Sequence, residues 1–157
     1  MYTRASVLIA LAFLTSPHAV RAQTGEYAPP KEDVAAVERA SLGYLDAIYK
    51  TDPSLIERYV HPSLTKVGYY RNQQGAWSES PMTYAQLLNV ARTWNAGGKA
   101  LRPDAPRTAV IYEVLNRTAS VKVVAQWGID YLQLAKYDDG WKIRHILWQE
   151  PPRSDKP

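Results

Sequence analysis

The sequence predicts an α+β fold in which helices come first and a sheet follows. The last third of the chain divides into three strand-like segments, 107–115, 119–136 and 141–149, joined by short polar turns. Upstream of them lie segments with the three- and four-residue apolar spacing of amphipathic helices. Strands that follow one another through short turns pair antiparallel, and helices grouped upstream cover one face of the sheet. We therefore expect a curved antiparallel sheet that is closed by helices around a pocket.

Residues 1–22 have the order of a secretory signal. Arg4 belongs to a short basic start, residues 5–14 are apolar apart from Ser6, and a cleavage point precedes Gln23. A membrane anchor is the alternative, but this apolar run is too short to cross a bilayer. We therefore expect an exported protein, periplasmic or secreted, without a membrane partner after cleavage. The rest of the chain then divides into a linker over 23–30, one domain over 31–152 and a tail over 153–157.

Composition argues against several classes of function. The formal net charge is +4 and falls by two, to +2, when the signal removes Arg4 and Arg21. Such a charge gives little reason to expect nucleic acid as a partner. The chain has no cysteine, which excludes disulfides, a thiol nucleophile and a zinc–thiolate site. It also lacks a glycine-rich phosphate loop, a nucleophile elbow and histidines at metal-ligand spacing. We expect no metal and no cofactor.

A first helix is predicted from Pro30 to about Lys50. Proline suits the first turn of a helix, and Glu32 and Asp33 lie near its positive end. The apolar positions of this helix recur at spacings of three, four and seven residues. They are Val34, Val37, Tyr44, Leu45 and Ile48.

A second helix is predicted to begin at Asp52, which serves as the N-cap, with Pro53 at the first helical position. It is expected to end at His61, because the residue before Pro62 is disfavoured in the α region.

The middle of the chain is predicted to add one strand and one helix. Residues 64–71 form the strand, and residues 72–81 are expected to be a polar loop. Thr83 and Gln86 then make a capping box, which predicts a third helix whose apolar face includes Trp94.

The order of these elements and three local signatures resemble the nuclear transport factor 2-like superfamily, also called SnoaL-like. The signatures are YLDAIY at 44–49 followed by LIERYVHP at 55–62, TYAQLL at 83–88, and DGWKI at 139–143 leading to ILW at 146–148. Within the superfamily the chain most resembles the branch named putative lumazine-binding proteins. The resemblance implies a cone, in which a curved sheet wraps around the first helix and a cavity lies between the sheet and the helices. It also implies that two copies of the protein form a homodimer through their sheet surfaces. It fixes no activity, because the superfamily includes ketosteroid isomerase, polyketide cyclases, dehydratases and plain binding modules.

Asp130 is the first candidate for chemistry. It lies in the middle of a predicted strand, where Asp is rare, and alternation places it with Val124, Leu132 and Leu134. We expect its side chain to point into the cavity, within reach of a Tyr or Trp donor. An unpaired carboxylate on an apolar face has a raised pKa and can act as a general base, or as a protonated hydrogen-bond donor. The alternatives are an Asp paired with Lys or Arg on a solvent face, or one bonded to backbone at a bulge made by Gly128.

His61 is the second candidate, because histidine is a common acid–base residue. A helix C-terminus also stabilises a charged histidine, which is a sufficient structural reason for its position. Among the many aromatic residues, five are expected to line a cavity for a flat ligand, although such residues also serve as ordinary core. These five are Tyr70, Trp94, Tyr112, Trp127 and Trp148.

The predicted function is the binding of a small apolar or aromatic molecule. One alternative is an enzyme of the isomerase, dehydratase or cyclase type that uses Asp130 as acid or base. A second alternative is an accessory domain whose sheet docks a protein. The predicted strand over 64–71 contains no Asp or Glu. Ketosteroid isomerases carry a carboxylate in the strand after the second helix, so its absence favours binding over catalysis.

Overall fold

The computed structural model describes residues 27–151 and has three helices and six strands within that range. The predicted signal, residues 1–22, and the predicted tail, residues 153–157, lie outside the described residues. The elements in chain order are α1 (Lys31–Tyr49), α2 (Ser54–Tyr59), β1 (Val60–Arg71), β2 (Trp77–Met82), α3 (Tyr84–Thr93), β3 (Thr108–Val114), β4 (Thr118–Ala125), β5 (Gly128–Tyr137) and β6 (Gly140–Gln149).

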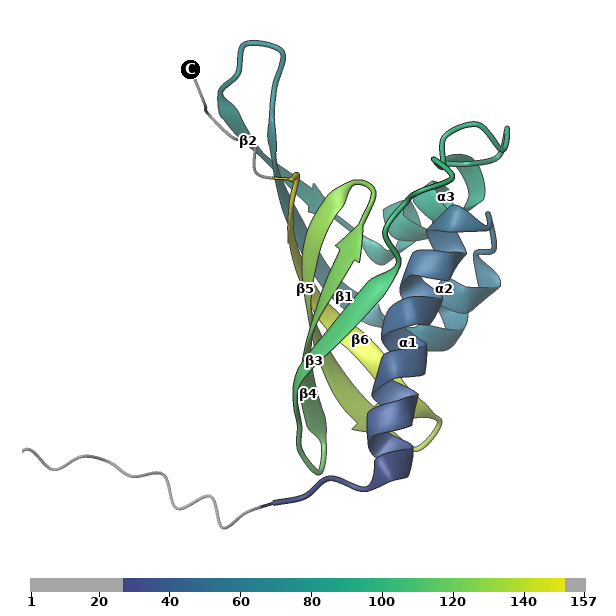
Figure 1. Ribbon diagram of the computed structural model, residues 1–157, viewed down its shortest axis with the longest axis vertical. Helices are drawn as coiled ribbons and strands as arrows, with labels where there is room; N and C mark the ends of the chain where they lie inside the picture. Colours follow the sequence, from purple (N-terminus) through teal and green to yellow (C-terminus); the bar gives the residue numbers. More distant parts are fainter. Residues whose placement is uncertain (1–26, 152–157) are drawn as a thin grey trace, which may run out of the picture.

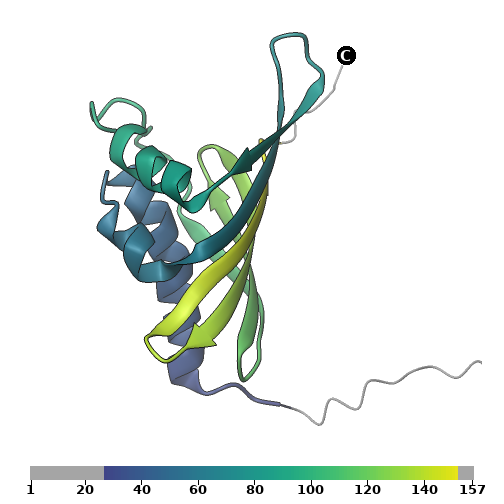
Figure 2. The ribbon, with the colours of Figure 1, turned by 180° about the vertical axis from the view of Figure 1, so that it is seen from behind.

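The strands form one curved, open sheet in the order β2-β1-β6-β5-β4-β3. All three helices lie against one face of this sheet, as Figures 1 and 2 show from opposite sides. The predicted α+β fold, with a curved sheet around N-terminal helices, is therefore confirmed. One detail differs, because β1 and β6 run parallel while the other four pairs of neighbours are antiparallel. The sheet is thus mixed, and the long stretch of chain between β1 and β6 makes their parallel pairing possible.

The predicted strand over 119–136 is wrong, because it consists of two strands, β4 and β5. They pair antiparallel from Thr118 opposite Ala135 to Ala125 opposite Gly128. The turn between them is Gln126-Trp127, which has none of the Asn-Gly or Asp-Gly character that marks a tight hairpin. This hairpin corner matters for function, since it sets the position of Trp127.

The predicted polar loop over 72–81 is also partly wrong. Its second half is β2, which pairs with β1 and forms one edge of the sheet. An edge strand has only one paired side, so it tolerates polar residues and Pro81, which cannot donate to a ladder. The β1–β2 hairpin projects beyond the rest of the sheet in Figure 1.

The second helix ends earlier than predicted. It stops at Tyr59, and the chain passes into β1 at Val60 without a loop. His61 is therefore a strand residue and not a helix C-terminal residue. The capping box of Thr83 and Gln86 is present at the start of α3, as predicted.

The core lies between α1 and the concave face of the sheet. The apolar face of α1 predicted from spacing is mostly buried: Val37, Tyr44, Leu45 and Ile48 belong to the core cluster, and Val34 packs against it. Leu132 and Leu134 of β5 point into the same core. Among residues 27–151 we find no helix with the length and apolar character needed to cross a membrane.

Candidate functional site

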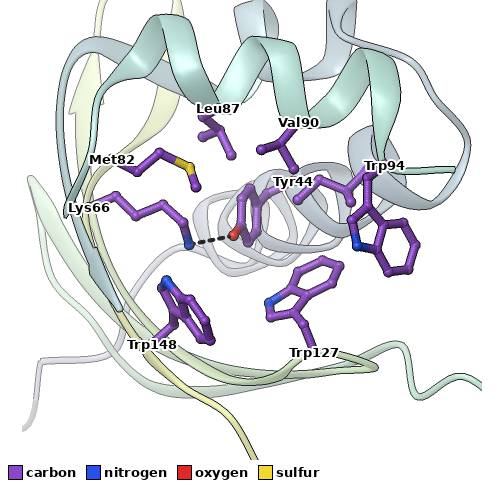
Figure 3. Close-up of a pocket in the computed structure, with 9 residues that line it drawn as sticks. Tyr44, Lys66, Met82, Leu87, Val90, Trp94, Trp127 and Trp148 are labelled. Carbon is purple, nitrogen blue, oxygen red and sulfur yellow. Dashed lines mark hydrogen bonds between the residues drawn. The ribbon is translucent and has the colours of Figure 1, made fainter. Parts of the chain in front are cut away.

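A cavity of about 230 Å³ lies between the helices and the concave face of the sheet, as Figure 3 shows. Side chains of α3 cover it on one side, and side chains of the sheet form the opposite wall. Its lining is almost entirely apolar and aromatic, with one charged group. The lining residues are Tyr44, Ile48, Lys66, Met82, Leu87, Val90, Trp94, Trp127 and Trp148.

Three tryptophans give the cavity its aromatic walls. Trp94 follows α3, Trp127 stands in the β4–β5 turn, and Trp148 lies near the end of β6. The Trp94 and Trp127 rings meet edge to face with centroids 5.8 Å apart, and Tyr49 packs against both. Edge-to-face packing of this kind adds to the stability of an aromatic cluster beyond area burial. The cavity therefore has a wall whose rings are held by one another.

A buried polar group adjoins the cavity, and we call it the Asp130 group. It consists of Asp130 and three residues that line the cavity, Tyr44, Lys66 and Trp127. Asp130 is fully buried, and its carboxylate accepts hydrogen bonds from the Tyr44 hydroxyl at 2.8 Å and from Trp127 Nε1 at 3.1 Å. Lys66 is 5% exposed and donates to the Tyr44 hydroxyl at 3.0 Å. Its Nζ lies 4.0 Å from the Asp130 carboxylate. Two opposite charges thus share one buried site.

Burial and charge act in opposite directions on the ionisation of this group. Burial raises the pKa of Asp130, and the charge of Lys66 together with the two hydrogen bonds limits that rise. Burial lowers the pKa of Lys66, and the Asp130 charge opposes that fall. Burial and the neighbouring carboxylate raise the pKa of Tyr44, so the phenol remains protonated. Tyr44 therefore connects the cavity to Asp130 through the hydrogen bond that its hydroxyl donates to the carboxylate.

Asp130 pairs with Val123 across the β4–β5 hairpin, so Val124, which was predicted to share its face, lies on the opposite face of the sheet. Strand alternation places Asp130 itself as predicted, on the buried face with Leu132 and Leu134. Its position relative to the cavity differs from the expectation that it would point into that space. Tyr44 and Trp127 separate it from the cavity, whose lining does not include it. Asp130 is therefore placed to act on a ligand only through Tyr44 or Lys66.

A glycine makes room for Trp148. Gly68 of β1 pairs with Trp148 of β6, and a Cβ at position 68 would lie 1.9 Å from the indole. Because glycine has no side chain, the indole can lie directly against the β1 backbone at this position. The sequence of β1 thereby helps to set the shape of the cavity.

The structure brings three of the five predicted aromatic residues to the cavity, namely Trp94, Trp127 and Trp148. The other two do not line it. Tyr70, near the end of β1, is 39% exposed, and Tyr112, on the edge strand β3, is 58% exposed. Both positions lie where the sheet extends past the helices or ends at its edge, so alternation alone did not reveal their exposure.

His61 also lies outside the cavity lining. Its ring stacks on Tyr137 with centroids 4.7 Å apart, and its Nδ1 lies 2.8 Å from the guanidinium of Arg144 and 3.1 Å from the backbone N–H of Ser63. Since arginine only donates, Nδ1 acts as the acceptor. These contacts give His61 a structural role in joining β1 to β6.

Lys66 and Tyr44 are the site residues that sequence reasoning missed. Lys66 alternates with Leu64 and Gly68 along β1, so a lysine on an apolar face was a visible signal. Tyr44 was assigned only to the core face of the first helix. Within residues 27–151 no three His, Asp or Glu side chains gather in a way that could hold a metal ion.

A curved open sheet, helices on its concave face and a cavity between them define a nuclear transport factor 2-like protein. Solved structures share this fold. A nuclear transport factor 2-like protein of unknown function from Silicibacter pomeroyi matches with a TM-score of 0.59 and 17% identity, over 76% of this chain and 96% of that one. A second, from Shewanella baltica, matches with a TM-score of 0.57 and 14% identity, over 81% and 100%. A protein from Novosphingobium aromaticivorans described as a putative aromatic ring hydroxylase matches with a TM-score of 0.51 and 12% identity, over 80% and 94%.

The chain belongs to the family described as putative lumazine-binding, whose model matches residues 32–149. A search of curated proteins gives no match. Membership of this family indicates a small molecule as the ligand.

Proposed function

We propose that this protein binds a flat, mainly aromatic small molecule in the cavity beneath α3. The observation that carries the proposal is the wall of three tryptophans around a single buried cation, Lys66. Aromatic rings favour flat partners, which stack on their faces or meet their edges. Ligand sites in proteins commonly combine an apolar lining with a few placed polar groups.

The size of the cavity suits a ligand of about two fused rings. An apolar cavity of about 150 Å³ is enough to admit benzene. A cavity of about 230 Å³ therefore has room for a bicyclic aromatic molecule without a long substituent. Lumazine, the compound in the family description, is a bicyclic heteroaromatic of this kind, so it is a suitable first probe.

Binding is tested by titration with lumazine and by a variant that fills the cavity. Val90 lines the cavity from α3, so Val90→Trp is expected to weaken binding at least about 10-fold by occupying the ligand's space. The matched control is Val110→Trp, on the exposed edge strand β3, which should bind as the wild type does. Native mass spectrometry of the purified protein identifies any molecule that remains bound. Equal binding by both variants, or no binding of any bicyclic aromatic compound, would contradict the proposal.

A second candidate function is an isomerase, dehydratase or cyclase that moves a proton through Tyr44. The hydrogen-bonded order Lys66, Tyr44, Asp130 favours it, since the first two residues line the cavity and Asp130 lies behind them. A ligand proton could pass to Tyr44 as Tyr44 gives its own to Asp130. For such an enzyme, Asp130→Asn would abolish turnover while ligand affinity changes little. Absence of turnover with every compound that binds would leave binding as the function.

We also propose that the protein is exported and that cleavage removes residues 1–22. The support is the order of basic start, apolar run and small-residue cleavage point in the sequence. The intact mass of protein recovered from the exported fraction should correspond to a chain that begins at Gln23. A full-length mass in that fraction would contradict cleavage.

A further inference from the structure

The sheet side of the cavity contains more hydrogen-bond donors than acceptors. Trp148 Nε1 is a buried side-chain polar atom that has no hydrogen-bond partner among the described residues. Lys66 Nζ makes one side-chain hydrogen bond, to Tyr44, although an ammonium carries three protons. Figure 3 shows the nitrogen of Trp148 on the edge of the indole that faces the Lys66 amine. Two donors with spare capacity therefore meet at one place.

The acceptors near these donors each accept at least one hydrogen bond from another group. The two carboxylate oxygens of Asp130 accept from Tyr44 and from Trp127. The Tyr44 oxygen in turn accepts from Lys66. Buried donors in proteins nearly always find a partner, because an unpaired one loses its bond to water without compensation. An acceptor supplied from the cavity would satisfy Lys66 and Trp148 together.

We propose that the ligand presents a neutral carbonyl oxygen to Lys66 and Trp148. This inference rests on the proposed function and specifies the chemistry of the ligand. The oxygen meets the Lys66 ammonium, which lines the cavity, and the covered Trp148 Nε1 donates to it after a small turn of the indole. The rings of the ligand then lie among the tryptophans.

The carbonyl is favoured over a carboxylate by the charge already present. Lys66 and Asp130 are opposite charges with Nζ and carboxylate oxygen 4.0 Å apart, so the pair is neutral as a whole. A ligand carboxylate would add a second negative charge beside Asp130 in a site with little water, where like charges repel strongly. A neutral carbonyl accepts the same hydrogen bonds without that repulsion.

The test compares two bicyclic probes of similar size, coumarin, which has a ring carbonyl, and naphthalene, which has none. Ligand-observed NMR gives the affinity of the wild type and of each variant for both. Trp148→Phe keeps an aromatic ring and removes the N–H, so it should weaken coumarin about 3- to 10-fold and change naphthalene less than about 2-fold. Lys66→Met keeps the length of the side chain and should weaken coumarin by at least as much. Trp77→Phe, at an exposed position outside the cavity, is the matched control and should change neither affinity.

The outcomes separate this inference from the proposed function. Equal losses for coumarin and naphthalene in both cavity variants would overturn the carbonyl, while binding itself would stand. Tighter binding of 2-naphthoate than of coumarin would overturn it in favour of an anionic ligand. If coumarin, naphthalene and lumazine all fail to bind the wild type, the proposed function fails and the inference fails with it. If lumazine binds and coumarin does not, the proposed function stands and the inference fails alone.

Discussion

Asp130 shows how strongly neighbouring side chains affect the pKa of one buried carboxyl group. Burial raises the pKa of its carboxyl, while Lys66, Tyr44 and Trp127 all stabilise the ionised form and lower that pKa. The net effect is a raised pKa, and removal of any one of these three partners should raise it further.

We therefore expect Asp130 to titrate above the reference value of about 3.9 and to shift further upward in Lys66→Met. The physical reason is that the variant removes the positive charge that lowers the pKa and leaves burial in place. The carboxyl carbon signal of Asp130, followed by NMR against pH, measures both values. Asp139 is an internal control, because Lys142 lowers its pKa from outside this group. A wild-type midpoint at or below the reference value would contradict the account.

Asp33 is a second buried carboxylate, with the opposite behaviour. It accepts from Lys136 Nζ at 2.7 Å and from Trp141 Nε1 at 2.9 Å, and these bonds lower its pKa. A carboxyl whose pKa is lower in the folded than in the unfolded chain stabilises the fold above the unfolded pKa of about 3.9, and this contribution is lost as pH falls through the folded value.

Asp33→Asn should accordingly reduce the free energy of unfolding by about 1–3 kcal/mol at pH 7. The difference from the wild type should shrink as pH falls below about 4, where Asp33 of the unfolded wild-type chain becomes protonated, and it should be lost once pH falls through the lower pKa of the folded state. Urea denaturation at a series of pH values measures this. A difference that stays constant down to pH 2 would show that packing, and not charge, is the source of the loss.

At the scale of elements, local sequence patterns correctly predicted the features that depend on contacts between residues close in the chain. The apolar spacing of α1 and the capping box of α3 depend on residues three or four positions apart, and both are present. The β4–β5 turn was missed because Gln126-Trp127 has no turn signature, and β2 was missed because an edge strand needs no apolar face. The place of Lys66 on the apolar face could be read from alternation, but its contact with Asp130 could not, since that contact depends on β1, β6 and β5 lying side by side.

Gly128 tests the role of the β4–β5 corner. Its φ is +144°, and an added Cβ would lie 2.0 Å from the backbone oxygen of Gln149. Gly128→Ala should therefore lower the free energy of unfolding by about 1–3 kcal/mol and displace Trp127, the residue that precedes it in the chain. Chemical denaturation measures the first effect, and the indole N–H signal of Trp127 by NMR reports the second. Gly97→Ala is the control, because nothing lies within 4 Å of its added Cβ. An unchanged Trp127 signal would show that other contacts hold the corner.

At the scale of the whole molecule, the face of the sheet opposite the helices carries exposed apolar residues. Tyr131 is 45% exposed and Leu147 is 51% exposed, and the two are direct neighbours on β5 and β6. Val67 of β1 continues the row beside Leu147. Contiguous exposed apolar residues of this kind often mark an interaction surface. The resemblance to the superfamily implies a second copy of the chain as the partner, and a docking domain for another protein is the alternative.

We predict that the protein forms a homodimer through this face and that Leu147→Glu converts it to a monomer. A glutamate at the centre of the row would bring an unpaired charge into the apolar interface. Because a two-fold dimer repeats every contact, both subunits would carry this charge. Light scattering at micromolar concentration measures the mass of each species. The matched control is Tyr112→Glu, which should remain dimeric. Tyr112 is exposed on the edge strand β3, where it borders a hollow beside α1. A monomeric wild type would refute the dimer, and a dimeric Leu147→Glu variant would move the interface to another part of the surface. Because the cavity lies on the other face of the sheet, between the sheet and the helices, ligand affinity should be the same in the monomeric variant as in the wild type.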